Sequence, residues 1–538
     1  MDTFRHDLKV RYYVGNILIG EIFIMKIFKT KKRKYIIISG LVSVFAIIGL
    51  CITYYNSIPR EEPLIGAYIN GTYSETLPTK GSGYAVEKIV CDNNKNASWD
   101  YNKWGIKLSN WGTRSRCNIY FKSLEIITIA NKTFYLDEAQ GCPTMNSDGT
   151  VTVTGTEDTY GYLCRAKDAY GDSYYYRGNV TNNYVLFAGK YWRIIRYNGD
   201  GTLRVIYDGT VAHANNDAST DRQIGYSKFN SNYNDNAGVG YMYGNRDDIV
   251  EQSTQYSTSS YANTRTYYIA KEYSYNASTD RFTLKNPIAV LGSSMTSDYI
   301  GYYTFNRTSS SVSDQYIYKI TSVTAGSSSA TIGYSHVTYG TTSKDKAQTN
   351  NNSSDIKAYL DTWYENNIKG TTNEQYVKDN LFCNDRSLSS NMPSGYNNKG
   401  YGTEKTSYRW YNFAYNWSNN NKMLLTCPQK NDAFTVNDTN KGNGALTYGI
   451  GLVTTDEVVL AGGWSSSNSN YYLYSGRNYW TMSPYSFNGG SALERIVYSN
   501  GFASNYDVNY SIGARPVLNL SSEILKNGNG TASDPYHA

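Results

Sequence analysis

The chain has 538 residues, of which 18% are charged and 15% aromatic, with 56 tyrosines against 15 phenylalanines and 9 tryptophans. Residues 1–34 hold nine basic and three acidic side chains, which already make up the net charge of +6, so the rest of the chain is close to neutral. A near-neutral chain without a long basic stripe excludes a nucleic-acid-binding protein, because phosphate contacts dominate that affinity.

Residues 35–55 form the first clear element. This run, YIIISGLVSVFAIIGLCITYY, has 21 residues and no charge. As a helix it spans about 31 Å, which is the thickness of a bilayer core. Four basic residues at 31–34 precede it, and the positive-inside rule keeps such a cluster in the cytoplasm. The sequence therefore predicts a signal anchor: a cytoplasmic basic segment over 1–34, one transmembrane helix over 35–55, and an extracellular remainder.

Three other interpretations of this run stay open. A buried core helix would be shorter and would lack the basic flank. A cleaved signal peptide would carry a small-residue cleavage site, which does not follow the run. A lipoprotein anchor on Cys51 would need Gly or Ala where Leu50 stands. A compact basic segment also begins at Met25, so we expect translation to start there and residues 1–24 to be a start-site artefact.

Six cysteines follow the hydrophobic run, and an even number behind an export signal indicates three disulfides. Six cysteines allow 15 pairings, so the sequence alone does not decide the connectivity. Pairing of nearest neighbours is the simplest solution, and no C-x-x-C spacing favours a metal or redox site instead. The predicted pairs are Cys91 with Cys117, Cys142 with Cys164, and Cys383 with Cys427.

Three small regions precede the main ectodomain. Residues 56–75, which include Pro59, Pro63 and Gly66, look like a stalk. Residues 76–122 contain three strand-like runs, so we expect a small β module whose first and last strands a 91–117 disulfide would join. We expect residues 123–180 to be a loop-rich, cysteine-containing region. Few residues in these regions favour long helices.

The main ectodomain is expected over 181–535. Residues 184–207 read as a β-hairpin with its turn at Asn198-Gly199-Asp200-Gly201. A long insertion is expected at about 211–350, and its first part, 211–285, is polar enough to be a surface loop. Closing strands are expected near the C-terminus, around 479–482, 493–498 and 515–520.

Two helices are expected inside this β-rich unit. Ser354 can cap a helix over 355–364 whose apolar residues fall on one face. Thr454 and Glu457 have the spacing of a capping box at the start of a second helix, which a glycine at 462 or 463 can end. Strands and helices in one unit predict an α+β fold. Trp192 and Trp480 lie inside strand-like apolar runs, so we expect both to be structural.

Three stretches carry a resemblance to known proteins: residues 184–207, 382–387 and 451–520. The segments GLVTTDEVVLAGG, YLYSGRNYWTMSP and GARPVLNL resemble an uncharacterised domain of exported proteins in low-GC Gram-positive bacteria. Their order is also similar to the C-type lectin-like fold of the formylglycine-generating-enzyme superfamily. That resemblance implies a lectin-like ectodomain in which the first and last strands pair.

The resemblance implies a fold and not an activity, because the functional residues of those families are missing. The formylglycine enzymes use a cysteine pair near the C-terminal end, and here no cysteine follows Cys427. The calcium-binding tripeptides of sugar-binding lectins are also absent. We therefore expect no cofactor and no metal site.

The sequence favours a bacterial cell-surface binding protein over an enzyme. It contains no G-x-S-x-G, Walker, H-E-x-x-H or G-x-G-x-x-G pattern. Tyr- and Asn-rich loops suit contacts with a surface glycan or protein. A structural envelope protein without a ligand, or an extracellular hydrolase, stays open. The expected contacts lie in the loops at 464–478, 483–491 and 502–511, and are Tyr471, Tyr472, Tyr485, Phe487, Tyr506 and Tyr510.

Overall fold

The computed structural model describes residues 64–92, 96–101, 103–109, 116–137, 141–258, 265–305, 313–325, 330–411, 421–464 and 466–538. The expected cytoplasmic segment, the expected membrane helix at 35–55 and the first part of the expected stalk lie outside these residues. Among the described residues, no helix has the length and apolar character needed to cross a membrane.

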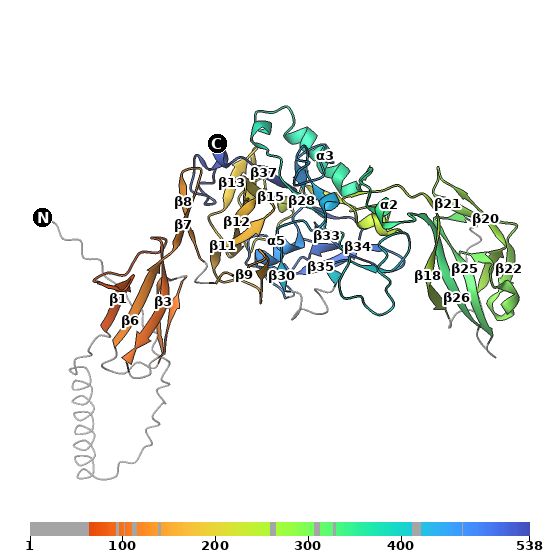
Figure 1. Ribbon diagram of the computed structural model, residues 1–538, viewed down its shortest axis with the longest axis horizontal. Coiled ribbons are helices and arrows are strands. Elements are labelled where there is room, and N and C mark those ends of the chain that lie inside the picture. The colour runs from red at the N-terminus through yellow and green to blue at the C-terminus, as the bar shows by residue number, and fades with distance from the viewer. Residues whose placement is uncertain are drawn as a thin grey trace, which may run out of the picture.

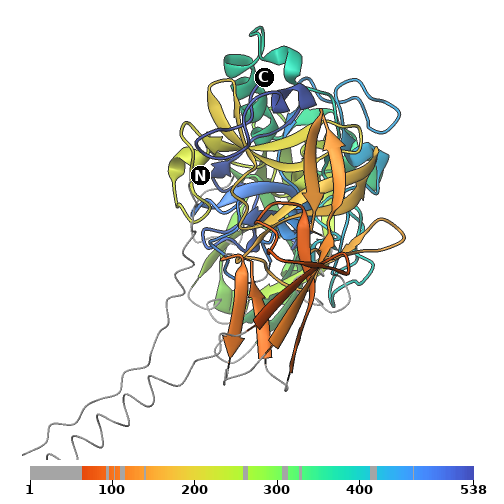
Figure 2. The same cartoon turned by 90° about the vertical axis from the view of Figure 1, so that its left-hand side faces the viewer.

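The protein is β-rich, with 42% strand and 12% helix, which confirms the β-rich part of the predicted fold class. It is elongated, with a small N-terminal module at one end, a large body in the middle and a separate lobe at the other end (Figure 1). Viewed from the end that carries the N-terminal module, the strands of that module stand in front of the body (Figure 2).

The N-terminal module is a four-stranded sheet in the order β2-β1-β6-β3, to which a short hairpin is added. It begins at residue 64 rather than at the expected 76, because β1 pairs in parallel with β6 and brings Ala67 into the module core. The Cys91–Cys117 disulfide joins β3 to β6, as predicted. The strands are β1 (Leu64–Ile69), β2 (Thr72–Ser74), β3 (Tyr84–Cys91), β4 (Asn96–Asp100), β5 (Gly105–Ser109) and β6 (Arg116–Ser123).

The region expected to be loop-rich, 123–180, is about half strand, and the loops lie mainly between β8 and β11. A first hairpin turns at Ala130-Asn131, where both residues have positive φ, as a tight hairpin turn requires. A second, longer hairpin joins the main sheet of the body. The elements are β7 (Glu125–Ile129), β8 (Lys132–Leu136), β9 (Thr144–Met145), β10 (Val151–Thr152), β11 (Gly161–Asp168) and β12 (Gly171–Gly178).

The main sheet of the body has the order β11-β12-β14-β15-β37-β32, with β13 paired to β14. The predicted hairpin turn at 198–201 is confirmed, but the run at 184–197 forms two strands, because Ala188 and Gly189 make a tight turn with φ of +51° and +67°. The C-terminal strand pairs with the second strand of the hairpin. These strands are β13 (Tyr184–Phe187), β14 (Lys190–Tyr197), β15 (Leu203–Gly209), β32 (Ile450–Gly451) and β37 (Val517–Leu520).

A second sheet of the body has the order β16-β36-β33-β34-β35, with β29 beside β33. It contains two of the predicted closing strands, those at 479–482 and 493–498, while the third, at 515–520, is β37 of the main sheet. Its strands are β16 (Gly225–Ser227), β29 (Thr406–Ser407), β33 (Tyr479–Phe487), β34 (Ala492–Val497), β35 (Ala503–Asp507) and β36 (Ile512–Ala514). Shorter strands complete the body: β17 (Met242–Tyr243), β27 (Asn352–Ser353), β28 (Phe382–Cys383), β30 (Lys422–Met423) and β31 (Ala433–Phe434).

Both predicted helices are present, and each has its predicted cap. Ser354 accepts a hydrogen bond from the Lys357 amide at the start of α3 (Asp355–Asn367). Thr454 and Glu457 form a capping box on α5 (Thr455–Leu460), and Gly462 follows with φ of +114°. A further short helix, α2 (Lys344–Gln348), precedes α3.

The expected insertion is divided between two parts of the molecule. Residues 248–340 form the lobe, which has apolar clusters of its own around Tyr267 and Phe282. The stretch before it is no surface loop, since Arg222 and Phe229 are fully buried in the body. The lobe contains β18 (Asp248–Thr258), β19 (Thr266–Ala270), β20 (Glu272–Asn276), β21 (Arg281–Lys285), β22 (Ile288–Leu291), β23 (Tyr303–Thr304), β24 (Ser313–Asp314), β25 (Tyr316–Ala325) and β26 (Ala330–Gly340).

Trp192 and Trp480 lie in the core of the body with no exposed surface. The Trp192 indole donates to the Phe187 carbonyl at 3.1 Å, and that of Trp480 donates to the Ser227 carbonyl at 2.8 Å. Burial of a Trp with its N–H satisfied is typical of a structural residue. The predicted structural role of both is confirmed.

Candidate functional site

A cleft of about 540 Å³ opens where the N-terminal module meets the β7–β8 hairpin and the body. We call it the aromatic cleft, because nine of its lining residues carry rings. From the module come Tyr84, Tyr101 and Trp104, from β8 come Phe134 and Tyr135, and from the body come Tyr160, Tyr162, Tyr176 and Tyr536. The polar lining residues are Lys80, Thr133, Asp137, Asn179, Thr181 and Asn182.

Ring contacts link the two sides of the cleft. The Tyr101 ring meets the Tyr160 ring edge to face, with centroids 5.5 Å apart. Tyr101 also lies 6.3 Å from Trp104, and Tyr160 lies 6.1 Å from Tyr162. The rings therefore form a continuous row from the module to the body, and such contacts hold aromatic side chains in defined orientations.

Local backbone features place these rings. Trp104 stands in the turn between β4 and β5 with φ of +49°, and its indole donates to the Pro78 carbonyl at 2.5 Å. Gly83 has φ of +85°, and a Cβ at this position would overlap the Tyr135 ring. Gly83 thus allows the module to approach the β7–β8 hairpin closely. A larger residue there would push the two walls of the cleft apart.

Asp137 contributes a carboxylate to the cleft at the end of β8. Its Oδ2 accepts the Leu163 amide at 2.9 Å, and its own amide donates to the Leu163 carbonyl at 2.9 Å. Burial raises the pKa of Asp137 to about 6, and only the Leu163 hydrogen bond opposes this. Burial also raises the pKa of Tyr101, with a smaller contribution from the Asp137 charge. The negative charge of Asp137 therefore contributes to the raised pKa of a tyrosine that lines the same cleft.

This arrangement suits binding better than hydrolysis. A glycosidase needs two carboxyl groups that flank the bond to be broken. Among the lining residues that the structure describes, Asp137 is the sole acid. Ligand sites commonly combine apolar and aromatic walls with a few polar groups that orient the ligand, and the cleft has this composition.

A second cluster of charged side chains lies inside the body, around a cavity of about 20 Å³, which has room for one water molecule. Arg409 binds Asp385 at 2.5 Å and also pairs with Asp456. Arg204 binds Glu457 at 2.5 Å. Burial opposes the charge of Glu457, but Arg204 and Arg196 outweigh it and lower the pKa of Glu457. These carboxylates are occupied as counter-ions, so this cluster is structural.

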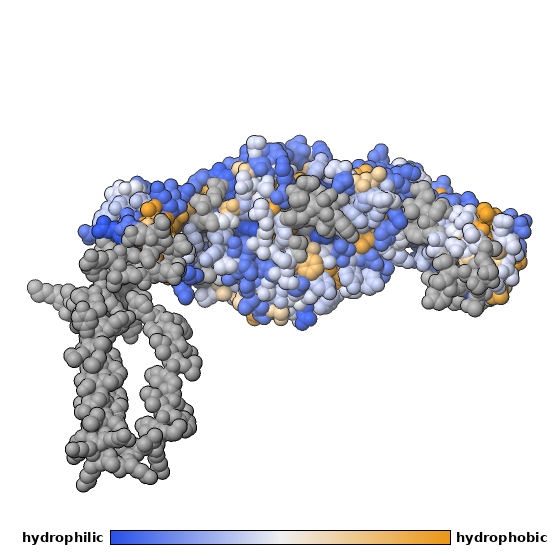
Figure 3. Space-filling view, turned by 90° about the horizontal axis from the view of Figure 1, so that it is seen from below, coloured by the Kyte–Doolittle hydropathy of each residue, from blue (hydrophilic) through white to orange (hydrophobic). Residues whose placement is uncertain are grey.

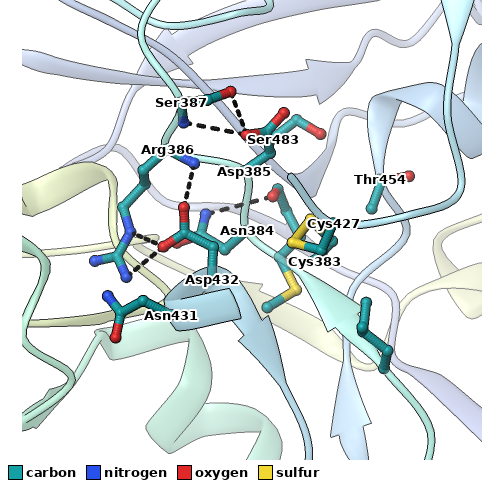
Figure 4. Close-up of a disulfide and its surroundings, with 12 residues drawn as sticks. Cys383, Asn384, Asp385, Arg386, Ser387, Cys427, Asn431, Asp432, Thr454 and Ser483 are labelled. Carbon is teal, nitrogen blue, oxygen red and sulfur yellow. Dashed lines mark hydrogen bonds and ion pairs between the residues drawn. A yellow bond between two sulfur atoms is a disulfide. The ribbon is translucent and has the colours of Figure 1, made fainter. Parts of the chain in front are cut away.

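The Cys383–Cys427 disulfide borders the same cavity (Figure 4). Beside it, the Arg386 side chain binds Asp432 at 2.7 Å, and the Arg386 amide donates to the same carboxylate at 2.7 Å. Ser483 accepts a hydrogen bond from the Thr455 amide at 2.9 Å. With both sulfurs in a disulfide and Ser483 holding the start of α5, this region shows no activated nucleophile among the described residues.

The structure does not bring the six expected contact residues together. Tyr471, Tyr472 and Phe487 have no exposed surface, and Tyr485 is 6% exposed. The Tyr472 hydroxyl donates to the Tyr176 carbonyl at 3.2 Å inside the body. The prediction of these four as ligand contacts is corrected: they are core residues, because β33 runs through to Phe487 and the 464–478 segment packs inward.

Tyr506 and Tyr510 are exposed, with their ring centroids 5.0 Å apart. They are the two expected contact residues that reach the surface, and neither lines the aromatic cleft. The cleft itself was missed by sequence reasoning. Its Tyr and Trp residues are visible in the sequence, but they come from four separate segments that only the fold brings together.

The three predicted disulfides are confirmed. Each pairs neighbouring cysteines along the chain: Cys91–Cys117, Cys142–Cys164 and Cys383–Cys427. The part of the chain that the structure describes contains no group of three or more His, Cys, Asp or Glu side chains that could hold a metal ion. Comparisons with protein families, curated proteins and solved structures gave no match.

Proposed function

We propose that this protein is a membrane-anchored binding protein of the bacterial cell surface and that the aromatic cleft binds a glycan. The observation that carries the proposal is the row of rings from Trp104 through Tyr101 to Tyr160, set among hydrogen-bonding side chains. Tyr and Trp rings offer a flat apolar face together with a polar tip. A sugar ring presents apolar C–H groups on its faces and hydroxyls around its edge, so it matches both parts of this lining.

The face of the molecule seen in Figure 3 supports a glycan rather than a protein partner. The coloured part of the face in Figure 3 is mainly hydrophilic, with small hydrophobic spots. Protein interfaces usually have a broad apolar centre with a polar rim. A cleft of about 540 Å³ lined with rings takes a few sugar units more readily than a folded domain.

Two features of the sequence support the surface location. The uncharged run at 35–55 follows a basic cluster, which is typical of a signal anchor. Three disulfides fit an oxidising compartment outside the cytoplasm. We further propose a C-type lectin-like fold for the body, supported by the pairing of β15 with the C-terminal strand β37 and by the capped helix α5.

The glycan proposal is tested with the full chain in detergent on an array of bacterial and host glycans. We expect binding that the Tyr101→Ala, Trp104→Ala double variant abolishes, because the row of rings is then broken. Tyr510→Ala, an exposed tyrosine outside the cleft, is the control and should bind normally. Equal binding by the double variant would place the site elsewhere, and binding only to proteins would refute the glycan.

The topology is tested on intact cells. External protease should degrade the chain beyond about residue 60, because the basic cluster at 31–34 keeps the preceding segment inside. A chain that stays intact until the cells are opened would contradict a surface location.

A further inference from the structure

We infer that the aromatic cleft selects a saccharide with a free amino group, whose ammonium lies beside Asp137 and against the surrounding rings. The inference rests on the proposed glycan-binding function and adds the chemical class of the ligand. It comes from the carboxylate of the cleft and from the kind of surface that surrounds it.

The carboxylate of Asp137 has a free side. The Leu163 amide occupies Oδ2 at 2.9 Å. Across the residues that the structure describes, no side chain or backbone group donates a hydrogen bond to Oδ1, and no cation forms an ion pair with either oxygen. A half-buried carboxylate in this state gains from a positively charged partner, because burial has removed much of its hydration.

The rings around Asp137 add to the same preference. Asp137 lines the cleft together with Tyr101, Tyr162 and Tyr176, and its carboxylate accepts the amide of Leu163, the residue that follows Tyr162. The faces of aromatic rings carry negative potential and attract ammonium groups within about 6 Å of the ring centroid. A carboxylate among such rings therefore makes a site for a cation.

The other charged side chains near the cleft do not neutralise Asp137, so the preference for a cationic ligand remains. Lys80 also lines the cleft and is exposed, but its charge does not offset the effect of burial on Asp137. Asp100 of the module is already bound to Lys107 at 3.0 Å. Glu157 contributes a negative charge near Tyr162.

The negative charge of Asp137 also predicts different affinities for neutral, acidic and amino sugars. A neutral or N-acetylated sugar would cover the carboxylate without compensating its charge. An acidic sugar would be repelled by it. An amino sugar presents hydroxyls and C–H groups to the rings and an ammonium to Asp137, so it satisfies both parts of the lining.

The experiment compares matched oligosaccharides on the full chain. Tetramers of glucosamine and of galactosamine are each titrated against their N-acetylated forms at pH 7. We expect the free-amine forms to bind at least tenfold more tightly. Asp137→Asn should reduce this preference to threefold or less, because Asn keeps an acceptor for the Leu163 amide but loses the charge. The melting temperature of the variant checks that it is folded.

Asp158→Asn is the matched control. It removes the same charge from an exposed residue near Tyr160 that does not line the cleft, so the preference should persist. Equal loss of preference in both variants would mean a general charge effect and would overturn the inference.

The failures are distinguishable. Equal affinity of the wild type for both forms, with loss of all binding in the Tyr101→Ala, Trp104→Ala variant, would overturn the amino-sugar inference and keep the glycan proposal. No binding of any tetramer, with a different glycan bound on the array, would overturn the amino-sugar inference alone. Tetramer binding that the double variant does not change would overturn both.

Discussion

Asp208 forms ion pairs with three buried arginines in the core of the body, and its replacement tests how much these ion pairs stabilise the fold. It lies at the end of β15 without exposed surface, 2.7 Å from Arg222, 3.1 Å from Arg515 and 3.8 Å from Arg193. These guanidiniums come from segments far apart in the sequence. One buried carboxylate thus serves as counter-ion for three buried cations.

Asp208→Asn keeps the size of the side chain and removes its charge. Removing one partner of a buried ion pair costs about 3–5 kcal/mol, because the other charge stays buried without compensation. The arginines retain backbone acceptors, for example the Tyr472 carbonyl for Arg222 at 3.0 Å and the Leu473 carbonyl for Arg515 at 2.6 Å. These acceptors leave the guanidiniums with hydrogen-bond partners but without a counter-ion. We therefore expect the variant to fold, with a free energy of unfolding lower by about 3–5 kcal/mol.

The assay is denaturation by guanidinium chloride, followed by tryptophan fluorescence of the full chain. Asp298→Asn, at an exposed position in the lobe, is the matched control and should change the unfolding free energy by less than about 0.5 kcal/mol. An Asp208→Asn protein as stable as this control would show that the carbonyl acceptors alone suffice, and would refute the counter-ion argument.

Three further predictions concern the core, the disulfides and the cleft. Trp480→Ala should lower stability by about 3–5 kcal/mol through the cavity it leaves, and an unchanged melting temperature would contradict a structural role. A thiol reagent applied to the denatured, unreduced ectodomain should label none of its six cysteines, and six free thiols would refute the disulfides. For Asp137, burial raises the pKa to about 6, so the folded state loses stability as pH rises from about 4 to above 6. Asp137→Asn should therefore raise the melting temperature at pH 8 but not at pH 4, and an equal effect at both would contradict the buried charge.

The sequence by itself determined the features that depend on neighbouring residues. Ser354 and the pair Thr454 and Glu457 cap their helices as predicted, because capping needs only residues three positions apart. The turn at 198–201 closes its hairpin for a similar reason. The disulfides join neighbouring cysteines, so the simplest pairing was correct. The apolar surroundings of Trp480 along the chain were enough to predict its burial.

Only the tertiary structure decided which distant segments meet. The parallel pairing of β1 with β6 turned part of an expected stalk into a strand. Tyr472 and Phe487 looked like contact residues, yet packing against strands far away in the chain buried them. The aromatic cleft needs the module, the β7–β8 hairpin and the body side by side. Tyrosine occurs both in protein cores and on binding surfaces, because its ring is apolar and its hydroxyl is polar. Whether a given tyrosine is buried depends on the segments that pack against it, and the neighbouring sequence does not encode those segments.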